Sequence, residues 1–332
     1  MTDFVAAGAR ARGLRAHLFT RAELEKLAGE DSLGRGLARS GKLVAAPADA
    51  APTQELEGAI RQTAKHHLAT LARWEGAAPV IEVFSAEQDR RSLRALLRGA
   101  QQAAPSDRRL AGLLPTSTLP ERLLCDLARL PTPAGIVSHL VSVDHPDAGR
   151  LFLLTHQKAQ PDLFAVDVAL VQAFGARSRR GEGDEPLRRF IAHRLDVSNA
   201  QTAVMLEGAR DVDADTCFVE GGSSLTREAF LELARARLTD AGAILRRALS
   251  GTPLSKLGEG LVDGLTLERT GFCLLLDEQR RAAREHPLSS APALAFLLLL
   301  DAMLRDLRRI VWGLALGAPP GLIRPELVTP WS

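Results

Sequence analysis

The sequence contains no tyrosine, and aromatic residues make up only 4% of its 332 positions. A core with so few rings must be built mainly from leucine, alanine and valine, and leucine and alanine favour helices. Strand signals are almost absent as well: the short β-branched run at residues 80–84 could be extended, but it could equally begin a helix. We therefore expect an all-α fold.

Cysteine is scarce too. Cys125, Cys217 and Cys273 are widely spaced, and no CxxC pair occurs. An odd number of isolated cysteines favours neither a disulfide scaffold nor a zinc site. We expect a reducing, cytoplasmic setting in which all three are small buried apolar residues.

Long hydrophobic runs and an excess of one charge are also missing. The longest apolar run, residues 291–300, contains a proline and ends at Asp301, whereas a helix that crosses a bilayer needs about 20 apolar residues. Asp3 and the arginines that follow it interrupt any apolar stretch near the start, so we expect no signal peptide. The net charge of +2 gives no indication of a general nucleic-acid binder.

No catalytic or metal-binding pattern is found either. Residues 36–42 fit the first seven positions of a phosphate-binding loop, but Leu43 stands where a serine or threonine must bind magnesium, and no strand precedes the segment. His66 and His67 are adjacent on an expected helix, so they face different ways and cannot easily chelate one metal ion. We expect no enzymatic activity in this chain, and no cofactor or metal ion.

What the sequence does have is helical periodicity. Thr20 is expected to begin a helix as its N-cap, with Glu23 completing a capping box, and residues 34–41 are expected to form a break. The expected helices span residues 4–18, 20–27, 53–74, 115–130 after an initial turn, 151–174 with an interruption at Pro161, 187–208, 226–249, 265–284 and 292–316.

One amphipathic stretch, residues 89–99, stands out. Leu93, Leu96 and Leu97 share one helical face, and Gly99 closes the run as helix ends prefer. The arginines at positions 90, 94 and 98 form a basic stripe beside that face.

Segments similar to this stretch recur along the chain. Aligning Asp89 with Asp196 places Leu119 and Leu225 at nearly the same offset, each at the start of a helix with an early acidic residue. Because the copies are roughly 100 residues apart, they favour three related helical subdomains around a pseudo-threefold axis over a solenoid of short repeats. The matched segments are 19–28, 119–128 and 225–234, and, position for position, 92–99 and 306–313.

In order and together, these segments resemble the C subunit of prokaryotic V-type (A/V-type) ATPases and ATP synthases, called the d subunit in the eukaryotic vacuolar enzyme. The resemblance covers essentially the whole chain, and its most specific part is residues 304–313 followed by 319–324. The other segments that carry it are 9–18, 89–99, 113–120 and 195–199.

The resemblance implies a single domain over residues 1–332 with the shape of an all-helical funnel. We expect its three subdomains at residues 89–186, at 187–284, and at 1–88 combined with 285–332. In this family the subunit is a non-catalytic adaptor that sits on the membrane rotor ring and receives the lower end of the central stalk. It thereby couples ATP hydrolysis or synthesis to the transport of protons or sodium ions.

The implied partners are the D- and F-type subunits of the central stalk and the proteolipid subunits of the ring, without nucleic acid. The implied location is the cytoplasmic face of the membrane, peripheral and attached through the ring. A helical scaffold or regulatory protein unrelated to ATPases is the alternative.

Polar and basic helix faces would suit the lining of such a socket, because arginine presents a rigid fork of donors to acidic or carbonyl partners. Salt bridges between subdomains are an equally weighted alternative for the same side chains. The candidate partner-binding residues are Arg90, Arg94, Arg98, Gln201, Arg305, Arg308 and Arg309.

Overall fold

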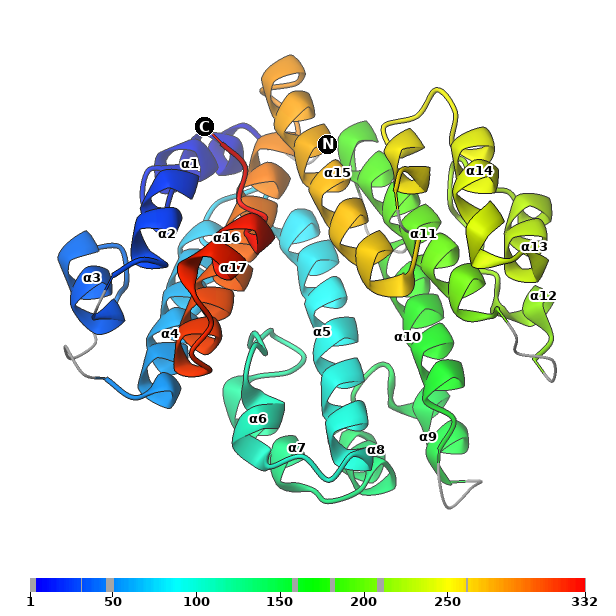
Figure 1. Ribbon diagram of the computed structural model, residues 1–332, viewed down its shortest axis with the longest axis horizontal. Coiled ribbons are helices and arrows are strands. Elements are labelled where there is room, and N and C mark those ends of the chain that lie inside the picture. Colours follow the sequence, from blue (N-terminus) through cyan, green and yellow to red (C-terminus); the bar gives the residue numbers. More distant parts are fainter. Residues whose placement is uncertain are drawn as a thin grey trace.

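The computed structural model describes residues 4–30, 32–45, 51–156, 161–179, 183–207, 212–260 and 262–331. Over these residues the chain forms seventeen α-helices and two short 3₁₀ helices, with no strand, which confirms the expected all-α fold (Figure 1). Within the same residues, no helix combines the length and the apolar character that a membrane span needs.

Six long helices form the frame and pack as three pairs. In each pair the two helices run along one another. In two pairs the short helices lie between the two long helices in the sequence, and in the third pair they come from the two ends of the chain. The pairs are α5 (Ala78–Gln101) with α10 (Leu163–Ser178), α11 (Glu185–Met205) with α15 (Gly264–Glu285), and α16 (Ala291–Ala315) with α4 (Thr53–Ala72).

The three pairs are joined at one end of the molecule, here called the apex. The turns at the apex include residues 73–77 and 286–290, which lead from α4 to α5 and from α15 to α16 (Figure 1). Asp184, the N-cap of α11, accepts a hydrogen bond there from the Ser290 amide, at 2.7 Å. Near the same end, the rings of His67 on α4 and Phe296 on α16 lie 5.9 Å apart.

Short helices complete each pair, and Figure 1 shows them as three separate groups around the frame. Four follow α5: α6 (Ser106–Leu110), α7 (Glu121–Arg129), α8 (Pro133–Ser142) and α9 (Ala148–His156). Four follow α11: α12 (Ala214–Cys217), α13 (Arg227–Arg235), α14 (Leu238–Ala248) and η1 (Ser255–Gly258). The third group combines α17 (Pro320–Ile323) and η2 (Arg324–Glu326) with α1 (Val5–Arg15), α2 (Arg21–Leu27) and α3 (Leu33–Ser40).

The third group is therefore built from both ends of the chain. α1 and α2 pack on α16, and the Arg21 guanidinium donates hydrogen bonds to the carbonyl oxygens of Leu327 at 2.5 Å and Arg324 at 2.7 Å. These contacts place α2 next to the C-terminal segment. In the other two groups, the equivalent helices α7 and α13 come directly after a turn of the same stretch of chain.

The helices α2, α7 and α13 bury the same positions of the matched ten-residue segments. The residue at the first position precedes the helix and is buried in each copy, and the sixth, ninth and tenth positions form the inner face. The buried residues are Phe19, Leu24, Leu27 and Ala28, then Leu119, Leu124, Leu127 and Ala128, then Leu225, Phe230, Leu233 and Ala234.

A fully buried aspartate lies on one long helix of each pair: Asp89 on α5, Asp196 on α11 and Asp306 on α16. Each carboxylate accepts hydrogen bonds from a turn more than twenty residues further along the chain. The donors are the hydroxyls of Thr116 and Thr118 for Asp89, the amides of Ser223, Ser224 and Leu225 for Asp196, and the amides of Val328 and Thr329 for Asp306.

These contacts change two details of the repeat. Asp306 has the same role as Asp89, so the alignment of residues 306–313 with 92–99 is displaced by three residues, about one helical turn. The expected boundary between residues 88 and 89 falls inside the continuous helix α5. That helix also resolves the choice at residues 80–84 in favour of a helix.

Local signals were correct at α2 and wrong at α3. The Thr20 side chain accepts from the Glu23 amide, and the Glu23 carboxylate accepts from the Thr20 amide, which confirms the capping box. Residues 34–41, expected to be a break, lie in α3 and its C-cap: Ser32 caps the start, and Gly41 ends the helix at φ 63°. The phosphate-loop-like residues 36–42 therefore lie on a helix and its end.

The expected helix over residues 226–249 is also wrong, because the chain turns at Ala236 and Arg237 and forms α13 and α14 separately. Both residues have extended backbone angles. Neither is a glycine or proline, so the local sequence gives no signal for this break.

The turn that Asp196 holds yields a stability prediction. A Cβ atom at Gly222 would lie 2.1 Å from Oδ1 of Asp196, and that carboxylate cannot move without losing its amide donors. We expect Gly222→Ala to lower the free energy of unfolding by about 2 kcal/mol or more, measured by urea denaturation.

Gly58→Ala on α4 is the matched control, because nothing lies within 4 Å of its added Cβ. It should raise stability by up to about 1 kcal/mol through helix propensity. Equal effects of the two substitutions would contradict the account of this turn.

Candidate partner interface

Ten charged side chains meet where α5, α10, α11, α15 and α16 come together, and we call them the charged cluster. Six arginines face four carboxylates there, so the cluster carries an excess of two positive charges. Its members are Glu87, Arg90, Arg91, Arg94 and Arg98 on α5, Asp167 on α10, Arg194 on α11, Glu268 on α15, and Asp301 and Arg305 on α16.

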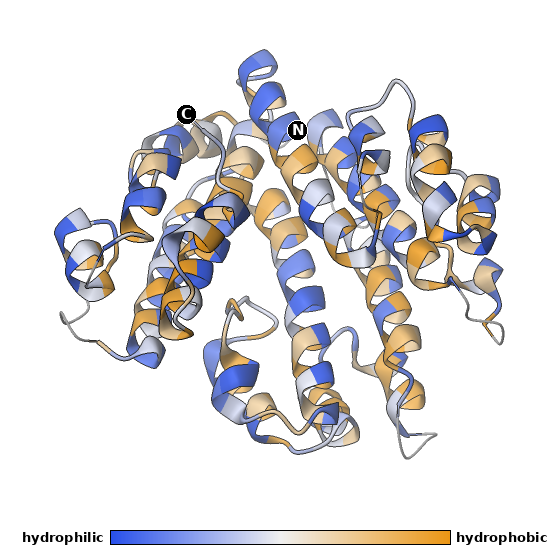
Figure 2. Cartoon of the chain, viewed as in Figure 1, coloured by the Kyte–Doolittle hydropathy of each residue, from blue (hydrophilic) through white to orange (hydrophobic). Residues whose placement is uncertain are grey.

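The periodicity of α5 explains why one helix supplies half of this cluster. Leu93, Leu96 and Leu97 are fully buried on one face, as their spacing predicts. The charged residues lie on the adjoining face, which points toward the neighbouring long helices. Figure 2 shows the middle of α5 as hydrophilic.

Two carboxylates tie α5 to the other pairs. Glu87 accepts from Arg90 on its own helix at 2.8 Å and from Arg194 on α11 at 3.0 Å. Asp301 on α16 pairs with Arg91 at 2.8 Å and with Arg305 at 3.1 Å. The cluster therefore connects all three helix pairs through buried charge.

Two further carboxylates lie at the more exposed edge of the cluster. Asp167 on α10 pairs with Arg98 and, at 3.3 Å, with Arg94. Arg94 also reaches Glu268 on α15 at 3.7 Å. Arg94 and Arg98 keep 26% and 36% of their side chains exposed, so a partner can still reach these two guanidinium groups.

Burial alone would raise the pKa of Glu87, Glu268 and Asp301, but the surrounding arginines outweigh it and hold all three below their ordinary values. Arg194 and Arg90 act on Glu87, and Arg305 and Arg91 on Asp301. Burial lowers the pKa of Arg305. The carboxylates are therefore ionised at neutral pH and depend on the arginines for it.

The cluster surrounds a pocket with apolar walls. Phe84, Phe190 and Phe272 line it together with the side chains of Arg91 and Arg305. The Arg305 guanidinium lies 3.9 Å from the centroid of the Phe272 ring, a cation–π contact that orients it. The lining also includes the carboxylates of Glu87, Glu268 and Asp301, so the arginines of the pocket already face acidic groups of the chain itself.

Of the seven expected site residues, the structure brings Arg90, Arg94, Arg98 and Arg305 into the cluster. Arg90 is only 5% exposed and forms a salt bridge with Glu87. It therefore has the internal role that was the alternative to direct contact with a partner. The other three remain partly exposed.

The remaining three expected residues lie outside the cluster. Arg308 pairs with Glu57 on α4 at 3.3 Å, and Arg309 with Asp306 at 3.0 Å. The Gln201 amide donates to the Gly264 carbonyl at 3.3 Å, which links α11 to the start of α15.

Sequence reasoning missed six members of the cluster: Arg91, Arg194 and the four carboxylates. The search followed an arginine stripe at intervals of four residues, which passes over position 91. Glu87 precedes Arg90 by three positions on the same helix, a spacing at which side chains meet. Asp167, Glu268 and Asp301 lie on other long helices, and the local spacing on α5 gives no signal for them.

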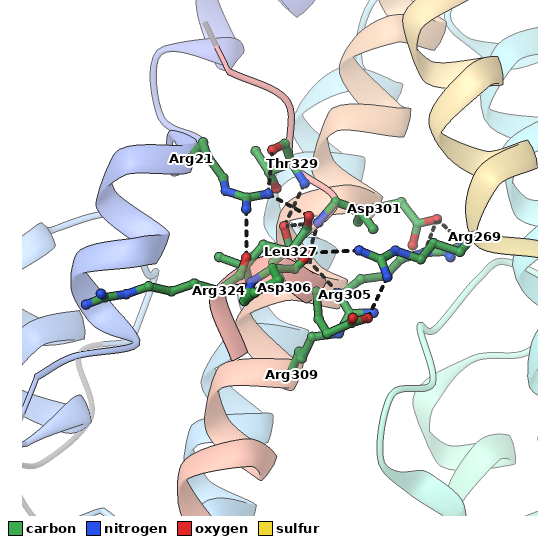
Figure 3. Close-up of polar contacts among 12 residues, drawn as sticks. Arg21, Arg269, Asp301, Arg305, Asp306, Arg309, Arg324, Leu327 and Thr329 are labelled. Atoms are coloured by element: carbon green, nitrogen blue, oxygen red, sulfur yellow. Dashed lines mark hydrogen bonds and ion pairs between the residues drawn. The ribbon is translucent and has the colours of Figure 1, made fainter. Parts of the chain in front are cut away.

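Next to the cluster, the C-terminal segment is fixed by arginines from two directions. Figure 3 shows Arg21 on one side and Arg269 on the other, with Asp306 between them. Arg269 on α15 donates to the Glu326 carboxylate at 2.6 Å and to the Pro325 carbonyl at 2.8 Å. Together with Asp306, these contacts keep α17 and η2 against the exposed edge of α16.

In the part of the chain that the structure describes, no group of three or more histidine, cysteine, aspartate or glutamate side chains is arranged to hold a metal ion. The geometry instead offers a charged, partly open interface between helices.

Comparisons with known proteins agree on one family. Residues 7–326 match the family model described as ATP synthase (C/AC39) subunit. The chain is 29% identical over 257 residues to the C subunit of the V-type ATP synthase of Thermus thermophilus, covering 76% of each protein. It is 28% identical over 174 residues to the C subunit of the A-type ATP synthase of Halorubrum lacusprofundi, covering 50% of each.

The charged cluster yields a prediction about pH. Asp301→Asn removes the nearest counter-charge of Arg91 and Arg305, whose side chains are largely buried, so we expect a loss of about 3 kcal/mol of unfolding free energy at pH 7. Asp126→Asn on α7, at an exposed pair with Arg129, should change it by no more than about 0.5 kcal/mol.

The sign of the pH effect follows from the lowered pKa of Asp301, whose ordinary value is 3.8. Its contribution is complete above pH 3.8 and is lost as the pH falls through the lower folded-state value. The difference in unfolding free energy between wild type and Asp301→Asn should therefore stay constant at neutral pH and decrease only below pH 3.8. A gap that already narrows at about pH 6 would refute the assignment.

Proposed function

This chain belongs to the ATP synthase (C/AC39) subunit family, and from that premise we propose that it is the central-stalk adaptor of a rotary V/A-type ATPase. In this role it sits on the membrane rotor ring, receives the lower end of the central stalk, and couples ATP hydrolysis or synthesis to proton or sodium transport. The family consists of structural rather than catalytic subunits. The observation that carries the proposal is the family match over nearly the whole chain.

The proposal includes three related subdomains arranged as a funnel, with boundaries between α4 and α5, between α10 and α11, and between α15 and α16. The three antiparallel helix pairs support it, as do the equivalent burial in α2, α7 and α13 and the equivalent roles of Asp89 and Asp196. One subdomain then combines the two chain ends, as the packing of α1 on α16 requires.

The socket for the stalk is proposed to lie at the open edge of the charged cluster. A rotor adaptor must transmit torque without slipping, and directional polar contacts fix the orientation of a partner better than apolar ones. The excess positive charge suits acidic side chains or helix C-termini of the stalk.

The proposed contact residues, toward the stalk or the ring, are the partly exposed members of the expected set: Arg94, Arg98, Gln201, Arg305, Arg308 and Arg309. Arg90 acts indirectly in this proposal, by holding Glu87 in place.

The proposed partners are the D- and F-type stalk subunits and the ring proteolipids, at the cytoplasmic face of the membrane. Family membership removes the alternative of a scaffold unrelated to ATPases. The resemblance of the chain to the C subunit of a V-type ATP synthase supports a peripheral location. No helix in the described residues is long and apolar enough to span a membrane.

Co-purification from detergent-solubilised membranes tests this function. We expect the tagged chain to recover stalk and ring subunits. The double variant Arg98→Gln with Arg309→Gln should recover several-fold less, because each side chain is about one-third exposed and a lost charged contact at an interface costs about 2 kcal/mol or more.

Arg129→Gln is the control, since it removes an exposed arginine from an outer helix. Its complex should be recovered in full. Because the double variant also loses the ion pairs of Arg98 with Asp167 and of Arg309 with the buried Asp306, recovery is compared at a temperature at which circular dichroism shows every variant to be folded. Full recovery of the complex by the double variant would contradict the assignment of these contacts, and absence of ring and stalk subunits in the wild-type sample would contradict the function.

A further inference from the structure

A second basic site lies at the apex, away from the charged cluster. It is a groove lined by residues of α1, α15 and α16, and the α16 residues form its floor. Arg12 and Arg15 form one wall, and Arg280 and Arg284 form the other. We call this site the arginine groove. It shares no residue with the candidate interface.

The floor of the arginine groove is apolar. Ala295, Phe296 and Leu299 of α16 form it, and Pro292 closes one end. Four guanidinium groups over an apolar floor form an amphipathic site. The first turn of the 25-residue helix α16 also lies there, but the Asp184 carboxylate already accepts hydrogen bonds from its N-cap Ser290, so the positive charge of the groove comes from its arginines.

The arginines of the groove are poorly satisfied within the chain. Arg12 donates to the Pro287 carbonyl at 2.7 Å, which orients it but leaves its charge unpaired. In the described residues, the side chains of Arg15 and Arg284 make neither a hydrogen bond nor an ion pair, and both residues are exposed.

Arg280 pairs with Asp277 at 3.5 Å, and within the described chain this is the only carboxylate in an ion pair with the walls of the groove. Arg280 also donates to the Trp331 carbonyl at 3.2 Å. Its Nε is nevertheless buried without a partner, which is costly unless a ligand or water supplies an acceptor. Glu285 is exposed at the end of α15 and makes no ion pair with these arginines in the described residues.

The size of the site favours a compact anion. On each wall the two arginines are three or four residues apart, so each wall spans one helical turn, about 5.4 Å. That is too short for the repeated anchors of a docked partner helix. It suits one phosphate group, which arginine forks bind in bidentate fashion.

The surroundings of the groove favour a phosphate attached to a lipid. Leu288, in the turn beside Pro287, is 69% exposed, and Trp74 in the neighbouring apex turn is 43% exposed. Exposed leucine and tryptophan next to arginines are typical of segments that bind at a membrane–water interface. We propose that the arginine groove binds the phosphate group of an acidic phospholipid, with the lipid's apolar part on the α16 floor and toward Leu288.

Vesicle flotation with the isolated full chain tests this proposal, independently of ATPase assembly. The probes are vesicles of phosphatidylcholine alone and of phosphatidylcholine mixed with phosphatidylglycerol. We expect binding only to the mixed vesicles. Arg15→Gln with Arg284→Gln should weaken it about 30-fold, since one basic residue near an anionic surface contributes about five- to sixfold.

Arg122→Gln with Arg235→Gln is the matched control. It removes the same charge from exposed side chains on α7 and α13, so it should retain nearly full binding. Both double variants should melt like wild type, because none of the four side chains has a hydrogen-bond or ion-pair partner within the described residues.

Three outcomes would overturn the proposal. The first is a failure of the basic prediction: the chain does not bind mixed vesicles, or the groove and control variants lose the same amount of vesicle binding. The second is groove-dependent thermal stabilisation by inorganic phosphate without vesicle binding, which would assign the site to a free anion. The third is groove-dependent binding of poly-glutamate without vesicle binding, which would assign it to an acidic protein segment.

Discussion

The fold depends on buried carboxylates that hold distant turns. Asp89, Asp196 and Asp306 lie at full burial on three long helices, and each accepts hydrogen bonds from a turn more than twenty residues away. Burial raises the pKa of Asp196 and Asp306, against the backbone donors that stabilise the ionised form. Such a group is tolerated only where its donors are supplied in full, so each turn has one permitted position.

The charged cluster is a second consequence of this arrangement. The turns determine where the short helices lie. The short helices do not come between the middle parts of the long helices, which therefore contact one another. Glu87 and Asp301 then bridge three helix pairs through Arg194, Arg91 and Arg305. Breaking such a buried network leaves an uncompensated charge, so the helix pairs are held at defined positions, which suits the proposed role of a torque-transmitting adaptor.

Sequence patterns predicted the helices and the equivalence of Asp89 with Asp196, because helical periodicity and recurring segments are local or self-similar signals. They failed where tertiary contacts decide. Gly36 was part of the segment predicted to be a break, but it lies in α3. An added Cβ there would lie 2.9 Å from Leu27, so this glycine allows α3 to pack closely on α2. Two partners of the arginines on α5 lie on other helices, more than 65 residues away for Asp167 and more than 200 for Asp301, so the local spacing on α5 does not indicate them.

The most direct test of the central claim is a cryo-electron microscopy map of the assembled membrane complex that contains this chain. The account predicts the chain between the ring and the central stalk, with the end of the stalk against the open edge of the charged cluster and acidic or carbonyl groups beside Arg94, Arg98 or Arg305. A chain bound at the periphery of the complex, or a stalk that contacts a surface without these arginines, would contradict it.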